Sequence, residues 1–232
     1  APVAMQSLTL APGERAEVLV DFSDARPAIL TTGPDPNTSG MMGMMGRMRG
    51  AAGSSPQRVV SFEPRGATGI PVPLPSRLIE QASNDASRAT RRRRFILEMG
   101  MGGRMAPPAA RRMPGAGRGS GMGVAAINGR AFDMDRVDEQ VRLGDLEIWE
   151  VSGEMMAHPI HIHGVQFEVL RRNGQSPTVR DQGLRDTVLV QEPVELLVKF
   201  TQPAEKAPFM YHCHILEHED NGMMGQFTTD PG

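Results

Sequence analysis

The stretch "YHCHILEHEDNGMM", Tyr211 to Met224, holds Cys213, the only cysteine among 232 residues, between two histidines. A second stretch, "HPIHIHG", begins at His158, and the two stretches together contain all six histidines of the chain. Histidines with purely structural roles would be scattered along the sequence. The concentration of all six histidines near the single thiol therefore indicates that they are metal ligands.

Each stretch is read as a strand whose side chains alternate between two faces. Alternation divides the ligands between two sites, because neighbouring residues point in opposite directions. One predicted site collects His158, Cys213 and His218. The other collects the remaining imidazoles, which are His161, His163, His212 and His214.

The first predicted site has the trigonal ligand set of a blue-copper centre, which adds a weak axial methionine. Met223 completes the spacing Cys-x4-His-x4-Met, whereas Met224, the competing choice, lies one residue too far. Zinc is the alternative metal, but structural zinc sites use more than one cysteine or a compact finger spacing. The all-histidine site suits copper that stays open to dioxygen.

Cys213 is joined covalently to His212 and His214, which belong to the second predicted site. By backbone dimensions, an electron that reaches the thiolate has about 10–13 Å to travel to that site. The cysteine is therefore predicted to bind an electron-accepting copper and to connect it with an oxygen-reducing cluster.

The composition favours short strands with many turns, since the chain holds 26 glycines and 19 prolines. Regularly spaced short strands predict an all-β sandwich. The segments expected to form strands are 13–22, 58–64, 91–99, 125–134, 139–153, 158–174, 185–190, 194–200, 208–215 and 225–230.

The charge pattern points to no nucleic-acid or membrane partner, because the net charge is only −2. No stretch approaches the roughly 20 apolar residues of a membrane span. The run Arg91 to Arg94 is interpreted as the solvated start of a strand rather than a phosphate or membrane patch, since no aromatic residue accompanies it.

The two histidine stretches together resemble the carboxyl-terminal copper signatures of multicopper oxidases, and most of all those of bacterial copper-efflux oxidases and laccases. The resemblance covers the whole chain and implies cupredoxin-like Greek-key β-sandwich modules. Residues 1–64 resemble the end of a second cupredoxin domain, 65–90 a linker, and 91–232 a third domain with a methionine-rich insert at about 100–123.

By this resemblance, the complete enzyme binds four coppers: one type 1, one type 2 and two type 3. The type 1 ligands would be His158, Cys213, His218 and Met223. His161 would bind the type 2 copper. The type 3 pair would take His163, His212 and His214.

The resemblance implies one-electron oxidation of Cu(I) or phenolic donors, coupled to four-electron reduction of dioxygen to water, in the periplasm or outside the cell. Cys213 would carry the electrons and Glu219 would relay protons. Glu154, Met156 and Asp220 would form a Cu(I) substrate site. The alternatives are a cupredoxin electron carrier and a copper-binding or storage protein, both without oxidase activity.

Methionine is abundant, with 17 in the chain. Two irregular clusters lie at 41–48 and 99–122 among Gly, Arg and Pro, where burial explains them poorly. Soft thioethers select Cu(I), so copper recruitment is the prediction for the second cluster, with a disordered spacer as the alternative.

A trinuclear cluster in this family takes eight histidines, and this sequence offers four outside the predicted type 1 site. Its first residues, "APVAMQSLTLAPGERAEVLV", read as the middle of a domain and show no signal peptide. We therefore expect amino-terminal domains with two His-x-His signatures, four further histidine ligands and an export signal.

Overall fold

The computed structural model describes residues 2–33, 56–66, 73, 84–100, 125–204 and 207–231. The chain divides into two compact units. Unit 1 contains Ala1–Thr9 and Ala16–Glu80, and unit 2 contains Leu10–Arg15 and Gln81–Gly232. The predicted domain boundaries at residues 64 and 91 stay predictions.

Unit 1 contains one antiparallel strand pair, β1 (Ala28–Thr31) and β2 (Arg58–Phe62). The strand predicted at 58–64 is confirmed. The strand predicted over 13–22 is wrong, because that stretch pairs with no strand in the described part of the chain. Its apolar residues, such as Val18 and Leu19, are exposed. Alternation alone does not make a strand when no neighbouring strand supplies the hydrogen bonds.

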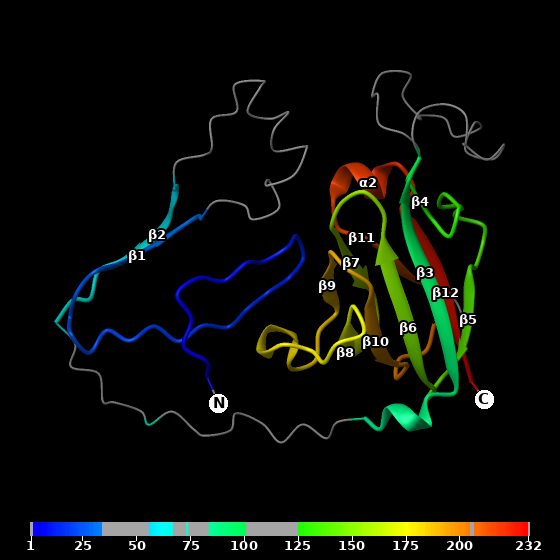
Figure 1. The fold of residues 1–232 in the computed structure, drawn as a ribbon, viewed down its shortest axis with the longest axis horizontal. Coiled ribbons are helices and arrows are strands. Elements are labelled where there is room, and N and C mark those ends of the chain that lie inside the picture. Colours follow the sequence, from blue (N-terminus) through cyan, green and yellow to red (C-terminus); the bar gives the residue numbers. More distant parts are fainter. Residues whose placement is uncertain are drawn as a thin grey trace. The chain divides into compact units, whose positions relative to one another are not determined.

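Unit 2 is a sandwich of two five-stranded sheets (Figure 1). The first sheet has the order β4 (Ala125–Ile127), β3 (Arg91–Met99), β6 (Leu146–Gly153), β10 (Val194–Lys199) and β8 (Gln166–Arg172). The second has the order β5 (Glu139–Arg142), β12 (Met224–Asp230), β11 (Phe209–Cys213), β7 (His158–Ile162) and β9 (Thr187–Val190). Each sheet contains one parallel pair, β3 with β6 and β5 with β12.

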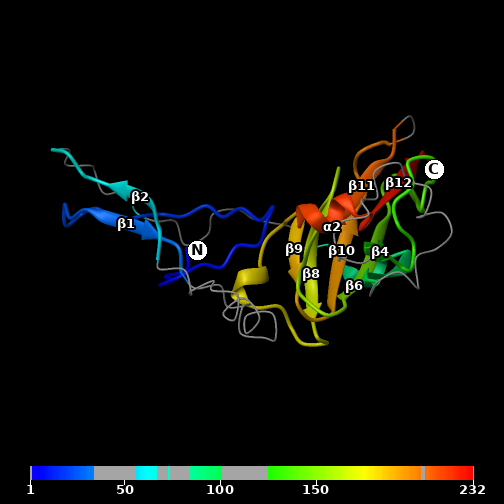
Figure 2. The same ribbon diagram turned by 90° about the horizontal axis from the view of Figure 1, so that it is seen from above.

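Helical structure is sparse in the described residues. The short helix α2 (Leu216–Asp220) follows β11 at one end of the sandwich (Figure 2), and two 3-10 turns occupy Ala86–Arg88 and Val179–Asp181. No helix in the described ranges is long and apolar enough to cross a membrane. The predicted all-β class is confirmed.

The core lies between the two sheets and is richest in aromatic rings around Trp149. Phe95 and Tyr211, which come from opposite sheets, have ring centroids 4.4 Å and 5.6 Å from that of Trp149. Strand alternation places these rings inward, and burying such rings contributes about 25 cal/mol for each Å² of apolar surface removed from water. The rigid core fixes the strand ends that carry the histidines.

The arginine run on β3 lies beside glutamates of the parallel neighbour β6. Arg93 contacts Glu147 at 2.6 Å, and Arg92 pairs with Glu150. These ion pairs along the sheet agree with the interpretation of the run as part of a strand.

Met99, the first residue of the second methionine cluster, ends β3 and packs against the core. The other methionines of the two methionine clusters are not described structurally. The cluster at 41–48 and residues 101–123 of the predicted insert lie outside the described residues. Their roles stay predictions.

Candidate metal centre

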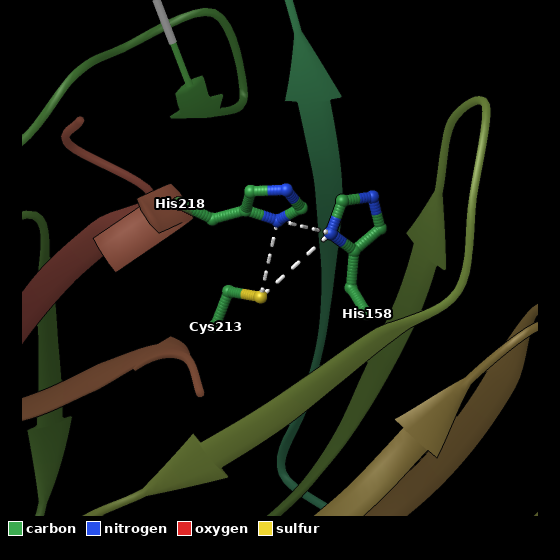
Figure 3. Close-up of side chains that lie close together, drawn as sticks. All are labelled: His158, Cys213 and His218. Carbon is green, nitrogen blue, oxygen red and sulfur yellow. Dashed lines mark hydrogen bonds between the residues drawn. The ribbon is translucent and has the colours of Figure 1, made fainter. Parts of the chain in front are cut away.

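The structure brings the three predicted ligands His158, Cys213 and His218 together, and we call them the first cluster (Figure 3). His158 begins β7, Cys213 ends β11, and His218 lies on α2. The Cys213 Sγ atom lies 3.5 Å from Nδ1 of His218 and 3.7 Å from Nδ1 of His158. The two Nδ1 atoms are 3.1 Å apart.

The two sulfur–nitrogen separations fit a trigonal metal site, because ligand atoms at 120° lie roughly 3.5–3.8 Å apart with metal–nitrogen bonds of about 2.0–2.1 Å and a metal–sulfur bond of about 2.3 Å. The nitrogen–nitrogen separation of 3.1 Å is shorter. With the same bond lengths it corresponds to a nitrogen–metal–nitrogen angle of about 100°. Figure 3 shows both rings and the thiol directed toward one central point. Two imidazoles and one thiol are the donor set that blue-copper centres use.

The first cluster is closed to water. His158 and Cys213 are fully buried, and His218 is 4% exposed. Burial lowers the pKa of both imidazoles, which keeps them neutral and able to bind a metal. Burial raises the pKa of the Cys213 thiol to about 11, so a metal that binds there must displace the thiol proton.

The loop between β6 and β7 sets the ring of His158. The Glu154 carbonyl accepts a hydrogen bond from His158 Nε2 at 3.2 Å, which places the proton on Nε2 and leaves the Nδ1 lone pair for the cluster. Gly153 gives the ring room, since a Cβ there would lie 2.8 Å from His158 Cδ2. The same loop contains Met155 in the left-handed region, with φ 65°.

The backbone ties Met223 to the first cluster. Cys213 N–H donates to the Met223 carbonyl at 3.1 Å, and Met223 N–H donates to the His218 carbonyl at 2.9 Å. Met223 is fully buried. Met224 lies directly opposite His212 in the β11–β12 ladder, so its side chain is on the His212 face of the sheet rather than the Cys213 face. This register favours Met223 as the fourth member.

The residues predicted for substrate copper occupy the elements that hold the first cluster. Glu154 and Met156 are on the loop before His158, and Asp220 ends α2. All three are exposed, Met156 by 37%. Their substrate role stays a prediction.

The four remaining histidines form a second cluster, consisting of His161, His163, His212 and His214. The Nε2 atoms of His163 and His212 are 3.0 Å apart, and ligand nitrogens of these two and His161 lie within 4.8 Å of one another. The His214 ring centroid is 5.5 Å from that of His212. The division that alternation predicted is therefore present in space, while the copper types remain assignments by resemblance.

Hydrogen bonds to backbone carbonyls fix which nitrogen is free in two rings of the second cluster. His161 Nδ1 donates to the Asp186 carbonyl at 3.0 Å, and His212 Nδ1 donates to the Cys213 carbonyl at 3.1 Å. Both rings therefore keep the Nε2 lone pair for a metal. Burial lowers the pKa of His161 and His163, so their neutral form is favoured.

Glu219 contacts the second cluster rather than the first. Its Oε2 atom lies 3.3 Å from His212 Nδ1. Asp186 and Thr187, beside His161, were not singled out from the sequence. They stand at the start of a predicted strand, and nothing in "RDTVLV" indicates that a histidine two strands earlier along the chain pairs with it.

Comparison with known proteins matches residues 104–232 to the multicopper oxidase family model. Over its whole length the chain is 35% identical to the cell division protein FtsP of Photorhabdus laumondii and covers 44% of that relative. The multicopper oxidase mco of Staphylococcus haemolyticus is 41% identical over 44% of this chain and 24% of its own length.

Solved structures agree with these matches. The laccase-like multicopper oxidase CueO of Ochrobactrum sp. superimposes with a TM-score of 0.70 and 34% identity, covering 91% of this chain and 43% of that chain. McoA of Aquifex aeolicus gives 0.65 at 28% identity, covering 91% and 42%. The chain thus spans less than half the length of the FtsP relative. The sandwich is cupredoxin-like, and the chain belongs to the multicopper oxidase family.

Proposed function

We propose that this chain accepts single electrons at a copper held by the first cluster and passes them to coppers held partly by the second cluster. The reaction would oxidise Cu(I) or phenolic donors and reduce one dioxygen to two waters with four electrons and four protons. One observation carries the proposal: Cys213 belongs to the first cluster, and the residues bonded to it, His212 and His214, belong to the second.

The donor atoms fit copper at both clusters. The first cluster, completed by Met223, has the mixed sulfur and nitrogen donors of a type 1 site. For the second cluster we assign His161 to type 2 copper, and His163, His212 and His214 to the type 3 pair. When bound, copper supplies reversible one-electron transfer, and the protein holds the donors in place.

Glu219 is proposed to deliver protons. Reducing dioxygen to water consumes protons at a site that the protein shields from water, so a carboxylate next to the cluster is needed to relay them. The contact of Glu219 with His212 supports this role, because it brings a titratable group to the cluster from a partly exposed helix.

The rim formed by Glu154, Met156 and Asp220 is proposed as the entry point for Cu(I). A thioether and two carboxylates combine a soft ligand with negative charge, which suits a soft cation. Their exposure beside a buried cluster supports delivery from solvent. Phenolic donors remain the alternative substrate class.

The full complement of four coppers needs ligands that this sequence does not contain. Four imidazoles cannot give three coppers two or three nitrogens each, and all six histidines are already in the two clusters. We propose that four further histidines come from polypeptide outside these 232 residues. By family resemblance the complete oxidase would work in the periplasm or outside the cell.

The test is to count coppers and record absorption spectra. In the complete oxidase we expect four coppers, an intense visible thiolate band, a near-ultraviolet band from coupled coppers, and oxygen uptake with Cu(I) or a phenol. The 232-residue chain alone should give the visible band without sustained turnover. Four coppers and sustained turnover from this chain alone would contradict the shared cluster. A visible band without oxygen uptake in the complete protein would indicate an electron carrier, and colourless Cu(I) a storage protein.

A role in cell division is a second candidate, favoured by the name of the FtsP relatives that align with the whole chain. Such a role needs no oxygen-reducing cluster. His163→Ala separates the two, because it should abolish oxygen uptake while leaving a non-oxidase function intact. If His163→Ala abolishes both oxygen uptake and the cell-division function, the two functions depend on the same copper chemistry.

A further inference from the structure

A tight turn at Ala11–Arg15 belongs to unit 2 and lies against the second cluster. Glu14 N–H donates to the Ala11 carbonyl at 3.0 Å, and Gly13 has φ +81°, a conformation that favours glycine. A Cβ on Gly13 would lie 2.5 Å from Cδ2 of His214. The turn backbone therefore packs directly on that imidazole.

Charged pairs attach this turn to the segment before β9. Arg15 forms a two-pronged ion pair with Asp186, with Nη1–Oδ1 at 2.5 Å and Nη2–Oδ2 at 2.8 Å. Glu14 accepts hydrogen bonds from Arg180 and Arg185 at 3.1 and 3.5 Å. Two-pronged pairing fixes direction as well as distance, which matters more here than its small energy at a surface.

The ion pair reaches His161 through Thr187. The Thr187 hydroxyl donates to Asp186 Oδ1 at 3.0 Å, so its oxygen lone pairs are left to accept from His161 Nδ1 at 2.9 Å. The Asp186 carbonyl accepts from the same Nδ1 at 3.0 Å. Two acceptors at one nitrogen hold the ring angle and keep its proton on Nδ1.

We propose that this brace, meaning the Ala11–Arg15 turn with Asp186 and Thr187, positions His161 and His214 for copper. It fixes His161 through hydrogen bonds and His214 through packing. The brace rests on the proposed copper role of the second cluster, but its effect on the rings exists without metal. Groups of this kind around a ligand commonly change metal affinity by about 10–100-fold when they are removed.

The first measurement uses the full chain without metal. Nitrogen-15 NMR of the histidine rings reports which nitrogen carries the proton. We expect His161 to be protonated on Nδ1, and Thr187→Val and Arg15→Gln to shift the ratio about tenfold toward the Nε2–H form. Arg15 is 68% exposed, so its replacement should leave the fold intact. Arg92→Gln removes a comparable surface pair on β3 and should leave His161 unchanged.

The second measurement tests the packing on His214. Gly13→Ala should move the His214 ring signals, whereas Gly174→Ala provides the matched control. Gly174 has a similar φ of +74° but nothing within 4 Å of its would-be Cβ. Both variants place an alanine at a similar positive φ, so the main difference between them is contact with the imidazole.

Copper gives an independent readout. After loading with Cu(II), the affinity of the second cluster should fall about tenfold in Thr187→Val and Gly13→Ala, while the visible band of the first cluster is retained. An unchanged His161 proton position in both Thr187→Val and Arg15→Gln would overturn the proposed positioning of His161 by hydrogen bonds. Equal shifts of the His214 ring signals in Gly13→Ala and Gly174→Ala would overturn the proposed positioning of His214 by packing. Neither NMR result depends on oxidase activity. A failure of the brace can therefore be distinguished from a failure of the proposed oxidase function.

Discussion

The first and second clusters use the same two strands, β7 and β11, yet they are built differently. The first cluster is buried, and its three donor atoms already lie close to the separations that a single trigonal metal requires. The second cluster is partly exposed, and two of its rings are set by hydrogen bonds to backbone carbonyls. A site for electron transfer benefits from a dry, rigid shell, whereas a site for dioxygen must remain reachable.

Support for the two clusters also comes from different distances along the chain. The first cluster is held by neighbours in sequence, including the Glu154 carbonyl and the backbone of Met223. The second depends on Arg15, which is 171 residues from its partner Asp186. The first cluster is therefore largely a local product of two strands and a helix, while the second depends on distant polypeptide.

The largest expected effect comes from Cys213→Ser. A hydroxyl cannot supply the soft thiolate, so the visible band and all electron transfer to the second cluster should disappear. Absorption spectroscopy after copper loading checks this, with His163→Ala as the comparison that should retain the band. A surviving intense band in Cys213→Ser would show that another residue binds the type 1 copper.

Glu219→Gln should act on the second cluster alone. Removing a proton relay is expected to slow oxygen reduction about 100-fold, while reduction of the first-cluster copper by a donor keeps its rate. Stopped-flow measurements of the two half-reactions separate these steps. The control is Glu217→Gln, an exposed acid on the same helix. Equal slowing by both variants would mean that the helix, and not the relay, was damaged.

Asp181→Asn probes the charged segment that leads to the brace. Burial by itself would raise the pKa of the Asp181 carboxyl, but hydrogen bonds from Arg172 and Thr178 outweigh it and leave the pKa below its usual value. Because the pKa is depressed, the ionised Asp181 carboxylate stabilises the fold above about pH 4. This contribution is lost as the pH falls through the pKa of the folded state.

The variant should therefore lose about 2 kcal/mol of unfolding free energy at neutral pH. Its deficit relative to the wild type should shrink on acidification below about pH 4. Chemical denaturation across this pH range measures the difference. A deficit that stays constant down to pH 2 would show that the carboxylate charge is not what stabilises this segment.

The smallest effect is expected from Met223→Leu. An axial thioether tunes a blue-copper site rather than holding it, so the colour should remain and the reduction potential should rise. Potentiometric titration compares this variant with Met224→Leu, whose side chain lies on the other face and should leave the potential unchanged. If only Met224→Leu changes the potential, Met224 is the axial ligand in place of Met223.

Much of the fold followed from local patterns. The strand predicted at Arg91 to Met99 has the bounds of β3, and the separation of His158 from His161 into different clusters followed from alternation. Both predictions depend on the two-residue period of side chains along a strand. That period can be read from a single stretch of sequence without knowing its neighbours in the sheet. The strand predicted over 13–22 failed because that period does not specify a pairing partner.

The sequence alone determined the set of candidate donor residues, because donor types and their spacing are properties of the residues themselves. Spacing favoured Met223 over Met224, but only the tertiary structure showed that Met224 lies on the His212 face, since the β11–β12 register sets the face of each side chain. It also showed that Gly13 packs on His214 and that Arg15 pairs with Asp186. Contacts between residues about 170 or more positions apart arise from how the sheets and turns pack together, and no local period encodes them.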